Sequence, residues 1–339
     1  MVQHLITDKS VLVTGGTGSF GQRFVVTLLN KFRPRRLVVF SRDELKQFEM
    51  AQRLSIEEYP SVRYFIGDVR DRERVMRACA GIDVIVHAAA LKQIVAAEYN
   101  PTECIATNIL GAQNVIDAAI ANDVERVVAL STDKAANPIN LYGATKLCSD
   151  KLFVAANNLA GRHRTRFSVV RYGNVVGSRG SVIPLFKKLA AEGRRSMPIT
   201  HEDMTRFVIT LDQGVQVVLH ALSDMDGGEI YVPKLPSIRV RDIVRYIVRD
   251  GTFEVIGVRP GEKLHEVMIP YEESRNAVDM GDHYILQPAF HWWNVHAIEA
   301  KIRERGRPAR GLFEYSSGTN SWWLENAELA RLVESVTVE

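Results

Sequence analysis

A glycine-rich turn near the start of the chain limits the possible folds more than any other feature. Residues 10–14 (SVLVT) form an apolar run that predicts a buried strand, and residues 22–30 show the pattern of an amphipathic helix. The intervening GGTGSFG contains Gly15, Gly18 and Gly21. In a strand–turn–helix unit such glycines allow a tight turn and a close approach of the backbone to a pyrophosphate, whose charge the helix N-terminus favours. The turn therefore predicts a dinucleotide-binding domain.

Strand and helix patterns alternate along the first half of the chain. This alternation is typical of a parallel sheet with helices on both faces. We therefore predict an α/β fold in which residues 1–172 form a Rossmann-type doubly wound parallel sheet. The predicted strands are 10–14, 36–40, 62–66, 83–87, 127–130 and 167–171, and the predicted helices are 22–30, 70–80, 101–121 and one that ends near 159.

The composition changes near Tyr172, where YGNVVGSRGS brings three glycines and few regular patterns. We predict a smaller mixed α/β lobe at 173–339 that mainly binds substrate, and we leave open whether the chain crosses back between the lobes. Asn174, Arg206 and Arg259 are its polar candidates, since an arginine can hold a diphosphate bidentately; a surface ion pair is the alternative for each arginine. Its predicted helices are 182–193, 211–222 and 240–248, and its predicted strands are 229–232 and 252–256.

The end of the second predicted strand indicates which nicotinamide cofactor binds. A domain that selects NAD usually places an acid there for the ribose 2′-hydroxyl, whereas here Phe40 is followed by Ser41 and Arg42. A serine can hydrogen-bond a 2′-phosphate, and an arginine can pair with it while stacking on adenine. These residues favour NADP and make 1–172 an NADP-binding domain. The alternative is that Asp43 holds the ribose and Arg42 is only exposed.

Residues after the third and fourth predicted strands are further candidates for cofactor contacts. Asp68 could accept the adenine amino group, or it could only cap the helix expected at 70–80. The small residues Ala88, Ala89 and Ala90 let the chain pass close to the cofactor, and Lys92 could reach a phosphate.

Two polar residues in this region have a structural and a functional interpretation. His87 ends the fourth predicted strand and is more readily explained as a packed core histidine than as a base. Asn108 lies within the helix expected at 101–121, where it could break the backbone ladder and organise a proton-relay water. A packed or solvated asparagine is the alternative.

The stretch STDKAANPINLYGATK carries the predicted chemistry. Tyr142 and Lys146 lie four residues apart, so that a helix would place phenol and ammonium on one face. The ammonium should lower the pKa of the phenol, which could then take a proton from an alcohol near neutral pH. Thr132, Asp133 and Lys134 follow a predicted strand, at the edge where open α/β sheets bind ligands. Taken separately, the Tyr142–Lys146 spacing is more often a solvated helix face, and Asp133-Lys134 after a strand is more often a turn than a catalytic pair.

Composition bounds the class of protein. With 339 residues, 46% hydrophobic and 24% charged, the chain is typical of a soluble protein with a large core. A net charge of +3 and only short basic clusters predict no nucleic-acid partner. We see no signal peptide and no apolar run of membrane-spanning length. Three separated cysteines fit a reducing compartment and form no metal spacing. We therefore expect a cytoplasmic protein without a metal or a membrane partner.

The chain resembles the extended short-chain dehydrogenases/reductases over nearly its whole length. Within that superfamily it is most similar to the inverting UDP-N-acetylglucosamine 4,6-dehydratases, which perform the first step of the pseudaminic acid route. Thr132-Asp133-Lys134 stands where related dTDP-glucose dehydratases carry Thr-Asp-Glu, whereas epimerases carry no acid–base pair there. The motifs that carry the resemblance are GGTGSFG, SRDELK, GDVRD, HAAALKQ, YGATK, RYGNVVGSRGSVIPLF, MTRF and RPGEKLHE.

The resemblance implies particular contacts. One departure is Ile94-Val95, where the family leads us to expect Val-Pro; it could alter a loop near the active site. The implied substrate contacts are Lys92, Asn174, Val182, Thr200 and Arg259. The implied cofactor contacts are Thr17, Gly18, Ser19, Phe20, Gly21, Ser41, Arg42, Asp43, Lys46, Asp68, Val69, Ala88, Lys92, Tyr142 and Lys146.

The resemblance also implies a mechanism and a UDP-sugar substrate. Tyr142, assisted by Lys146 and Thr132, would take the C4 hydroxyl proton; Lys134 would then remove the C5 hydrogen while Asp133 protonates the departing C6 hydroxyl. A lysine base needs a depressed pKa, which burial and nearby cations can supply. The alternatives are a nucleotide-sugar 4-epimerase or dehydrogenase, and a non-catalytic NADP-binding regulator. A homo-oligomer, dimer or hexamer, is expected, while the sugar's 2-substituent and the fates of C5 and C3 stay open.

Overall fold

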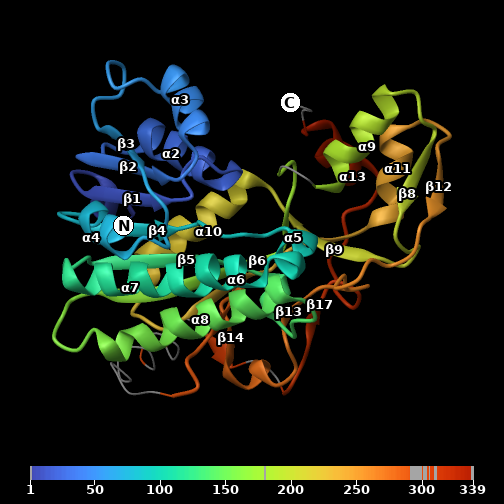
Figure 1. Cartoon of the computed structure of the whole chain (residues 1–339). Helices are drawn as coiled ribbons and strands as arrows, with labels where there is room; N and C mark the ends of the chain where they lie inside the picture. Colours follow the sequence, from blue (N-terminus) through green and yellow to red (C-terminus); the bar gives the residue numbers. More distant parts are fainter. Residues whose placement is uncertain are drawn as a thin grey trace.

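The protein consists of a large α/β lobe and a smaller lobe beside it, which are left and upper right in Figure 1. The computed structural model describes residues 2–178, 181–290, 300, 304, 306–308 and 311–336. Arg179 and Gly180 of the RYGNVVGSRGSVIPLF motif lie outside the described residues.

Ten strands of the described chain form one sheet in the large lobe. Neighbouring strands from β3 through to β10 are parallel, and β15, β14 and β16 add antiparallel pairings at one edge. This is the doubly wound order with a ligand edge beyond the carboxyl ends of the strands. In sheet order the strands are β3 (Val62–Ile66), β2 (Arg36–Ser41), β1 (Ser10–Thr14), β4 (Val84–His87), β5 (Arg126–Thr132), β6 (Arg166–Tyr172), β10 (Ile230–Pro233), β15 (His283–Leu286), β14 (Ala277–Asp279) and β16 (Arg307–Pro308).

Helices cover both faces of this sheet, as predicted. α2 packs on α10 on one side, while α4, α7 and α8 pack together on the other (Figure 1). The central strands are buried on both faces and rich in valine, so their burial supplies most of the core. The helical segments of this lobe are α1 (Val2–Ile6), α2 (Ser19–Lys31), α3 (Glu44–Arg53), α4 (Arg72–Ala78), α5 (Ile94–Tyr99), α6 (Pro101–Ile105), the π-helix η1 (Ala106–Leu110), α7 (Gly111–Ala121), the 3₁₀ turn η2 (Asp133–Ala135), α8 (Leu141–Leu159), α10 (Leu211–Asp224) and the 3₁₀ turn η3 (Glu273–Asn276).

The smaller lobe has its own apolar cluster, which includes Ile183, Phe186, Ile243 and Leu329. The second half of the chain nevertheless contributes strands to the large sheet, so that the chain does cross between lobes after residue 172. The remaining elements are β7 (Asn174–Val175), α9 (Val182–Ala191), β8 (Ser196–Ile199), β9 (Thr205–Ile209), β11 (Ser237–Arg239), α11 (Val240–Ile247), β12 (Thr252–Val255), β13 (Val267–Ile269), β17 (Tyr315–Ser316) and α13 (Asn326–Glu334).

The predicted helix at 101–121 is a continuous α–π–α run with a π-helical turn at η1. The helical run Pro101–Ala121 is long enough and apolar enough to cross a membrane. The expectation that no apolar stretch reaches membrane-spanning length is therefore wrong. Half of this run is buried inside the protein, where α7 packs on α4 and α8 as core helices do.

Candidate active site

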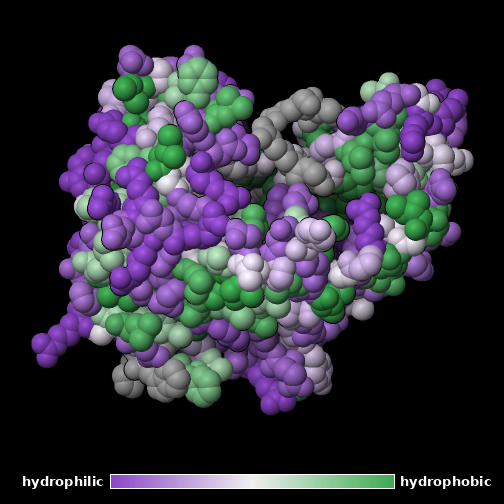
Figure 2. Space-filling model, viewed as in Figure 1, coloured by the Kyte–Doolittle hydropathy of each residue, from purple (hydrophilic) through white to green (hydrophobic). Residues whose placement is uncertain are grey.

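A cavity of about 860 Å³ lies where the carboxyl ends of the parallel strands face the smaller lobe, and Figure 2 shows the surface notched between the two lobes. Its size fits a site for a cofactor and a substrate. The fully buried Asp133 is the one predicted site residue that does not line it. The predicted residues that line it are Gly15, Thr17, Gly18, Ser19, Phe20, Gly21, Ser41, Arg42, Asp43, Lys46, Asp68, Val69, Ala88, Ala89, Ala90, Lys92, Thr132, Lys134, Tyr142, Lys146, Asn174, Val182, Thr200, Arg206 and Arg259.

The glycine turn is packed so tightly that side chains cannot replace its hydrogens. Gly15 has φ +63°, and a Cβ there would lie 2.8 Å from the backbone nitrogen of Ala89. A Cβ on Gly21 would lie 2.6 Å from the carbonyl oxygen of Gly15. Because β1 and β4 are neighbours, the turn and Ala88–Ala90 form one wall of the cavity. Close backbone approach at the N-terminus of α2 is the arrangement that a dinucleotide pyrophosphate requires.

The residues after β2 form a basic rim of this wall. The Ser41 and Thr17 hydroxyls lie 2.7 Å apart. Asp43 caps α3 by accepting from the backbone of Lys46, and it also pairs with the Lys46 ammonium at 2.7 Å. The guanidinium of Arg42 lies 3.6 Å from Asp68 and stays half exposed at the cavity. Asp43 and Lys46 are therefore paired with each other, and the half-exposed Arg42 lies beside them at the cavity.

Asp68 does not cap the helix that follows it, so that alternative is wrong. Asp71 caps α4 by accepting from the backbone of Arg74. Asp68 instead pairs with Arg70 at 2.7 Å. Burial would raise the pKa of Asp68, but its bonds with Arg70 outweigh burial and lower that pKa. Asp68 thus faces the cavity as an anion.

His87 is a packed core histidine, as predicted. Its Nδ1 lies 2.8 Å from the hydroxyl of Thr14 within the sheet. Burial, with a contribution from Lys146, lowers the pKa of His87 to about 3. The ring is therefore neutral and does not act as a base near neutral pH.

Asn108 occupies the π-helical turn and joins three segments. Its amide accepts from the backbone nitrogen of Leu91 at 2.8 Å, donates to the Leu91 carbonyl at 2.9 Å, and donates to the Thr145 hydroxyl at 3.0 Å. The helix ladder is altered at this position, as the first sequence interpretation proposed, and the side chain is packed and 1% exposed, as the alternative proposed. Single π-helical turns within α-helices are frequent at functional sites. Here Asn108 fixes the segment before Lys92 against α8.

Tyr142 and Lys146 lie on the first turns of α8 and line the cavity, as their spacing predicted. Asn140 caps this helix by accepting from the backbone of Gly143. Burial raises the pKa of Tyr142 to about 12, although Lys134 and a hydrogen bond with Thr132 oppose the shift. Burial lowers the pKa of Lys146. The prediction that the pKa of Tyr142 lies below its ordinary value is therefore wrong for the protein alone, because burial outweighs the nearby cations.

Lys134 lies between acidic groups on the turn η2. Its Nζ lies 2.9 Å from Oδ1 of Asp133 and 3.3 Å from Oδ1 of Asn174. Burial would lower the pKa of Lys134, but Asp133 and Glu266 outweigh burial and raise it. The prediction of a depressed pKa is thus wrong, because sequence reasoning included the cations and not the second carboxylate.

Glu266 is the residue that sequence reasoning missed. It is 2% exposed, and its Oε1 lies 3.2 Å from Nζ of Lys134 and 3.7 Å from Nε of Arg206. The Arg206 guanidinium also pairs with Glu262 at 3.2 Å. Arg206 therefore belongs to a buried network of ion pairs, and the alternative that it forms only a surface ion pair is wrong. The available signal was the RPGEKLHE motif, which ends in Glu266.

The other predicted substrate residues, Lys92, Val182, Thr200 and Arg259, also line the cavity. Thr200 is buried and its hydroxyl contacts Met204 Sδ at 2.9 Å, while Arg259 is exposed. Burial, with the nearby charge of Lys134, lowers the pKa of Lys92. Ile94 and Val95, the departure from the family pattern, begin α5 and line the same cavity.

A protein family described as "Polysaccharide biosynthesis protein" matches residues 11–288, which is most of the chain. The chain belongs to this family. Its membership, together with full-length relatives, confirms the resemblance to the extended short-chain dehydrogenases/reductases.

Two relatives of the chain carry different activities in their names. A Campylobacter jejuni protein named UDP-N-acetylglucosamine 4,6-dehydratase (inverting) is 50% identical over 97% of this chain and 98% of its own. A Rickettsia canadensis protein named UDP-glucose 4-epimerase is 41% identical over 83% of both. Among solved structures, Pen from Bacillus thuringiensis matches with 36% identity and a TM-score of 0.86, and covers 97% of this chain and 98% of its own. The family fold therefore extends over both lobes.

Proposed function

We propose that this protein is an NADP-dependent, C5-inverting UDP-N-acetylglucosamine 4,6-dehydratase. The observation that carries the proposal is the contact of 2.9 Å between Lys134 and Asp133: Lys134 lines the same cavity as Tyr142, and Asp133 lies buried directly behind Lys134. An acid and a base at the end of one strand are what the elimination of water requires. The name of the 50% identical Campylobacter relative, which covers both lobes, supports the same activity.

The wall formed by Gly15, Gly21 and Ala89 fits a nicotinamide dinucleotide, because a side chain at either glycine would collide with neighbouring backbone and open the tight turn that a pyrophosphate requires. When bound, the nicotinamide supplies the acceptor for hydride from C4 and the donor that returns it to C6. Arg42 and Lys46 would hold a 2′-phosphate, which is our reason for preferring NADP.

The residues of this chain divide the proton transfers. Tyr142, which is hydrogen-bonded to Thr132 and lies one helical turn from Lys146, takes the proton of the C4 hydroxyl. The positive charge of an oxidised nicotinamide bound beside Tyr142 would lower the pKa of the phenol. The resulting ketone acidifies the C5 hydrogen. The Lys134 amine takes that hydrogen as a proton, and Asp133 gives a proton to the C6 hydroxyl, which leaves as water. Arg259, at the mouth of the cavity, would hold the diphosphate.

An epimerase is the second candidate, because the Rickettsia relative carries that name. An epimerase needs only the oxidation at C4 and its reversal, for which Tyr142 and Lys146 suffice. In an epimerase the buried pair of Asp133 and Lys134 would take no part in the reaction. We therefore prefer the dehydratase.

Product analysis separates the two candidates. Purified protein would be incubated with UDP-N-acetylglucosamine in deuterated water, and the product examined by NMR and mass spectrometry. We expect a 6-deoxy-4-keto sugar with deuterium at C5, inverted C5 configuration, and the former C4 hydrogen at C6. A C4 epimer that keeps its C6 hydroxyl would reject the dehydratase in favour of the epimerase.

We also propose a homo-oligomer that assembles through the outer side of α5, η1 and α8. Tyr99, Leu110 and Leu159 are 56% to 87% exposed on these helices, although they are apolar or aromatic. Exposed apolar groups on neighbouring helices mark association surfaces. Sedimentation of the wild type against Tyr99→Glu would test this, since a monomeric wild type excludes the assembly.

A further inference from the structure

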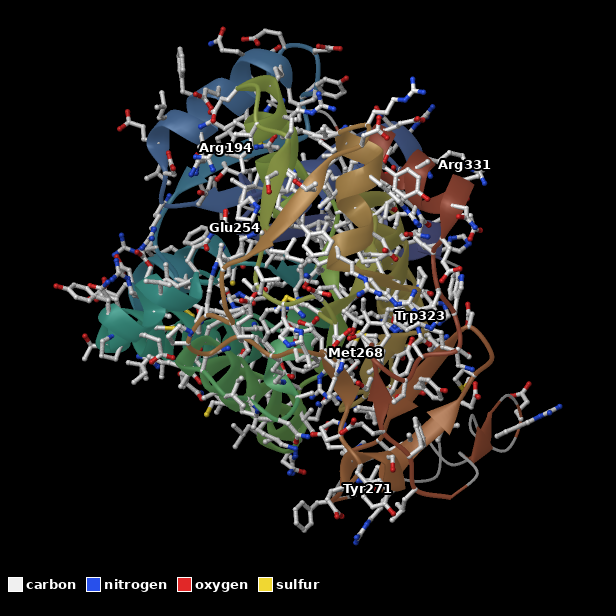
Figure 3. The ribbon with its side chains drawn as sticks, turned by 90° about the vertical axis from the view of Figure 1, so that its right-hand side faces the viewer. Arg194, Glu254, Met268, Tyr271, Trp323 and Arg331 are labelled. Atoms are coloured by element: carbon white, nitrogen blue, oxygen red, sulfur yellow. The ribbon has the colours of Figure 1, made fainter. Side chains whose placement is uncertain are left out.

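Glu266 reaches the acid–base pair from a distant part of the chain. It directly precedes β13, whose Met268 is labelled near the centre of the molecule in Figure 3. Its backbone nitrogen donates to Ser317 Oγ at 2.9 Å, and β13 packs against the turn η2. Its carboxylate therefore has a fixed position beside Lys134, in the wall of the cavity.

The Lys134 ammonium has an oxygen for each of its N–H groups. These are Asp133 Oδ1 at 2.9 Å, Glu266 Oε1 at 3.2 Å and Asn174 Oδ1 at 3.3 Å. An ammonium offers three donors and has no lone pair, so this arrangement holds the charged form. Lys134 can act as a base only after it passes a proton to one of its two carboxylate neighbours.

The direct ion pairs of the cluster leave one negative charge in excess. Three carboxylates, on Asp133, Glu266 and Glu262, contact two cations, on Lys134 and Arg206. Among the described residues, one oxygen of each carboxylate has no hydrogen-bond partner: Oδ2 of Asp133, Oε2 of Glu266 and Oε2 of Glu262. Asp133 is the most buried of the three, and burial favours the protonated form of a carboxylate.

Further groups face the cluster from neighbouring elements, and the cations among them oppose the negative excess. Burial and the charge of Glu266 raise the pKa of Asp133 against the opposing effects of Lys134 and Thr132. Burial would raise the pKa of Glu266, but three nearby cations outweigh it and keep Glu266 ionised. The titratable groups that face the cluster are Arg206 on β9, Lys92 after β4, Tyr142 on α8, and Glu262 and Lys263 before β13.

We propose that Glu266 is a positioning residue of the elimination step: it anchors the Lys134 ammonium against Asp133 and its charge keeps a proton on Asp133. The proposal rests on the dehydratase activity proposed above. The resting cluster then contains an Asp133 acid, a Lys134 ammonium and a Glu266 carboxylate. In this form the proton donor for the C6 hydroxyl is ready before the sugar is oxidised.

The proton transfers balance through this cluster. One proton passes from Nζ of Lys134 to Oε1 of Glu266 and leaves an amine. The amine takes the C5 hydrogen as a proton, and the electron pair of that bond forms the C5–C6 double bond as the C6–O bond breaks. Asp133 gives its proton to the leaving hydroxyl, and water departs. The cluster ends with the Asp133 carboxylate, the Lys134 ammonium and the Glu266 acid, so its total number of protons is unchanged.

The test compares Glu266→Gln, Glu266→Asp and the matched control Glu262→Gln in the holoenzyme. Glu262 and Glu266 both pair with Arg206, but of these two only Glu266 also pairs with Lys134 among the described residues. Single turnovers with UDP-N-acetylglucosamine would follow C4 oxidation by near-ultraviolet absorbance and 6-deoxy product by mass spectrometry over a range of pH. Melting temperature and cofactor affinity would establish that each variant is folded.

We expect Glu266→Gln to oxidise C4 at nearly the wild-type rate but to eliminate water roughly 10²-fold more slowly. Loss of its charge lets Asp133 lose its proton more readily, so the pH above which elimination declines should fall by about 1 unit. Glu266→Asp should recover part of the rate. Glu262→Gln, whose carboxylate pairs with Arg206 rather than with Lys134, should lower the pH limit less than Glu266→Gln does. Equal slowing of oxidation and elimination, or an unmoved pH limit, would overturn the proposal.

An infrared measurement keeps the proposal testable even if Glu266→Gln does not fold. The wild-type protein at neutral pH should show the carbonyl stretch of a buried protonated carboxylic acid, which Asp133→Asn removes. Absence of that band would also overturn the proposal. If wild-type protein forms no 6-deoxy sugar, the proposed function fails instead, whatever the infrared result.

Discussion

The α-carbon of Gly143 lies directly against the carbonyl oxygen of Lys134. A Cβ built on Gly143 would come within 2.2 Å of that oxygen, which belongs to the backbone and cannot rotate away. The first turn of α8 therefore sets the position of the turn η2. This contact ties the Tyr142 side of the site to the Asp133 side.

Gly143→Ala should displace the turn that carries Lys134. We expect it to lower turnover by about 10²-fold, which is typical of a 1 Å misplacement of catalytic groups, and to destabilise the protein by about 1–3 kcal/mol. The matched control is Gly214→Ala on α10, where a Cβ meets nothing within 4 Å. That control should stabilise the protein by about 1 kcal/mol and leave turnover unchanged. Steady-state rates and thermal melts would measure the turnover and the stability of both variants. Equal turnover and equal stability of Gly143→Ala and Gly214→Ala would contradict the role of the Gly143–Lys134 contact.

Arg42→Ala should shift cofactor preference toward NAD. The side chain is half exposed at the cavity, and a charged contact with phosphate is worth about 1.5–3 kcal/mol, so affinity for NADP should fall tenfold or more. Affinity for NAD should change little. Calorimetry with both cofactors would measure this, and Arg63→Ala, outside the cavity, is the control. Equal affinity of the wild type for NAD and NADP would reject the role of Arg42.

Tyr142→Phe should abolish C4 oxidation and keep the fold. The phenol is the group that we propose to accept the C4 proton, and positioned bases contribute roughly 10²–10⁴-fold. Because the pKa of Tyr142 is raised to about 12, the phenolate fraction grows with pH, so wild-type oxidation should speed up as pH rises toward that value. Single-turnover absorbance should show this rise in the wild type and not in Tyr142→Phe. Near-full turnover by the variant would exclude this role.

Lys134→Ala should still oxidise C4 but fail at elimination. The near-ultraviolet absorbance of the reduced cofactor should then persist, with little 6-deoxy product. Removing one partner of a buried ion pair costs about 3–5 kcal/mol, so melting temperature must be measured alongside. Lys151→Ala is the control, since that lysine is exposed in its pair with Glu273. Normal 6-deoxy product from Lys134→Ala would leave the elimination to Asp133 alone.

The sequence by itself determined the features that depend on local pattern. The run at 10–14 with its glycine turn predicted β1 and α2, because strand burial, glycine geometry and helix periodicity are encoded within about twenty residues. The spacing of Tyr142 and Lys146 placed both on one side of α8 for the same reason. The carboxyl ends of parallel strands must share an edge, so the cofactor residues after β1, β2 and β4 were predicted to line one cavity.

Only the tertiary structure decided the ionisation of the site. The pKa values of Tyr142 and Lys134 both depend on burial. That of Lys134 also depends on the charge of Glu266, which lies far away in the sequence and reaches η2 through β13. The bonds of Asn108 to Leu91 and Thr145 likewise join segments that no local pattern connects. Desolvation and Coulomb interactions act through space, so the chain must fold before its charges determine which groups hold protons.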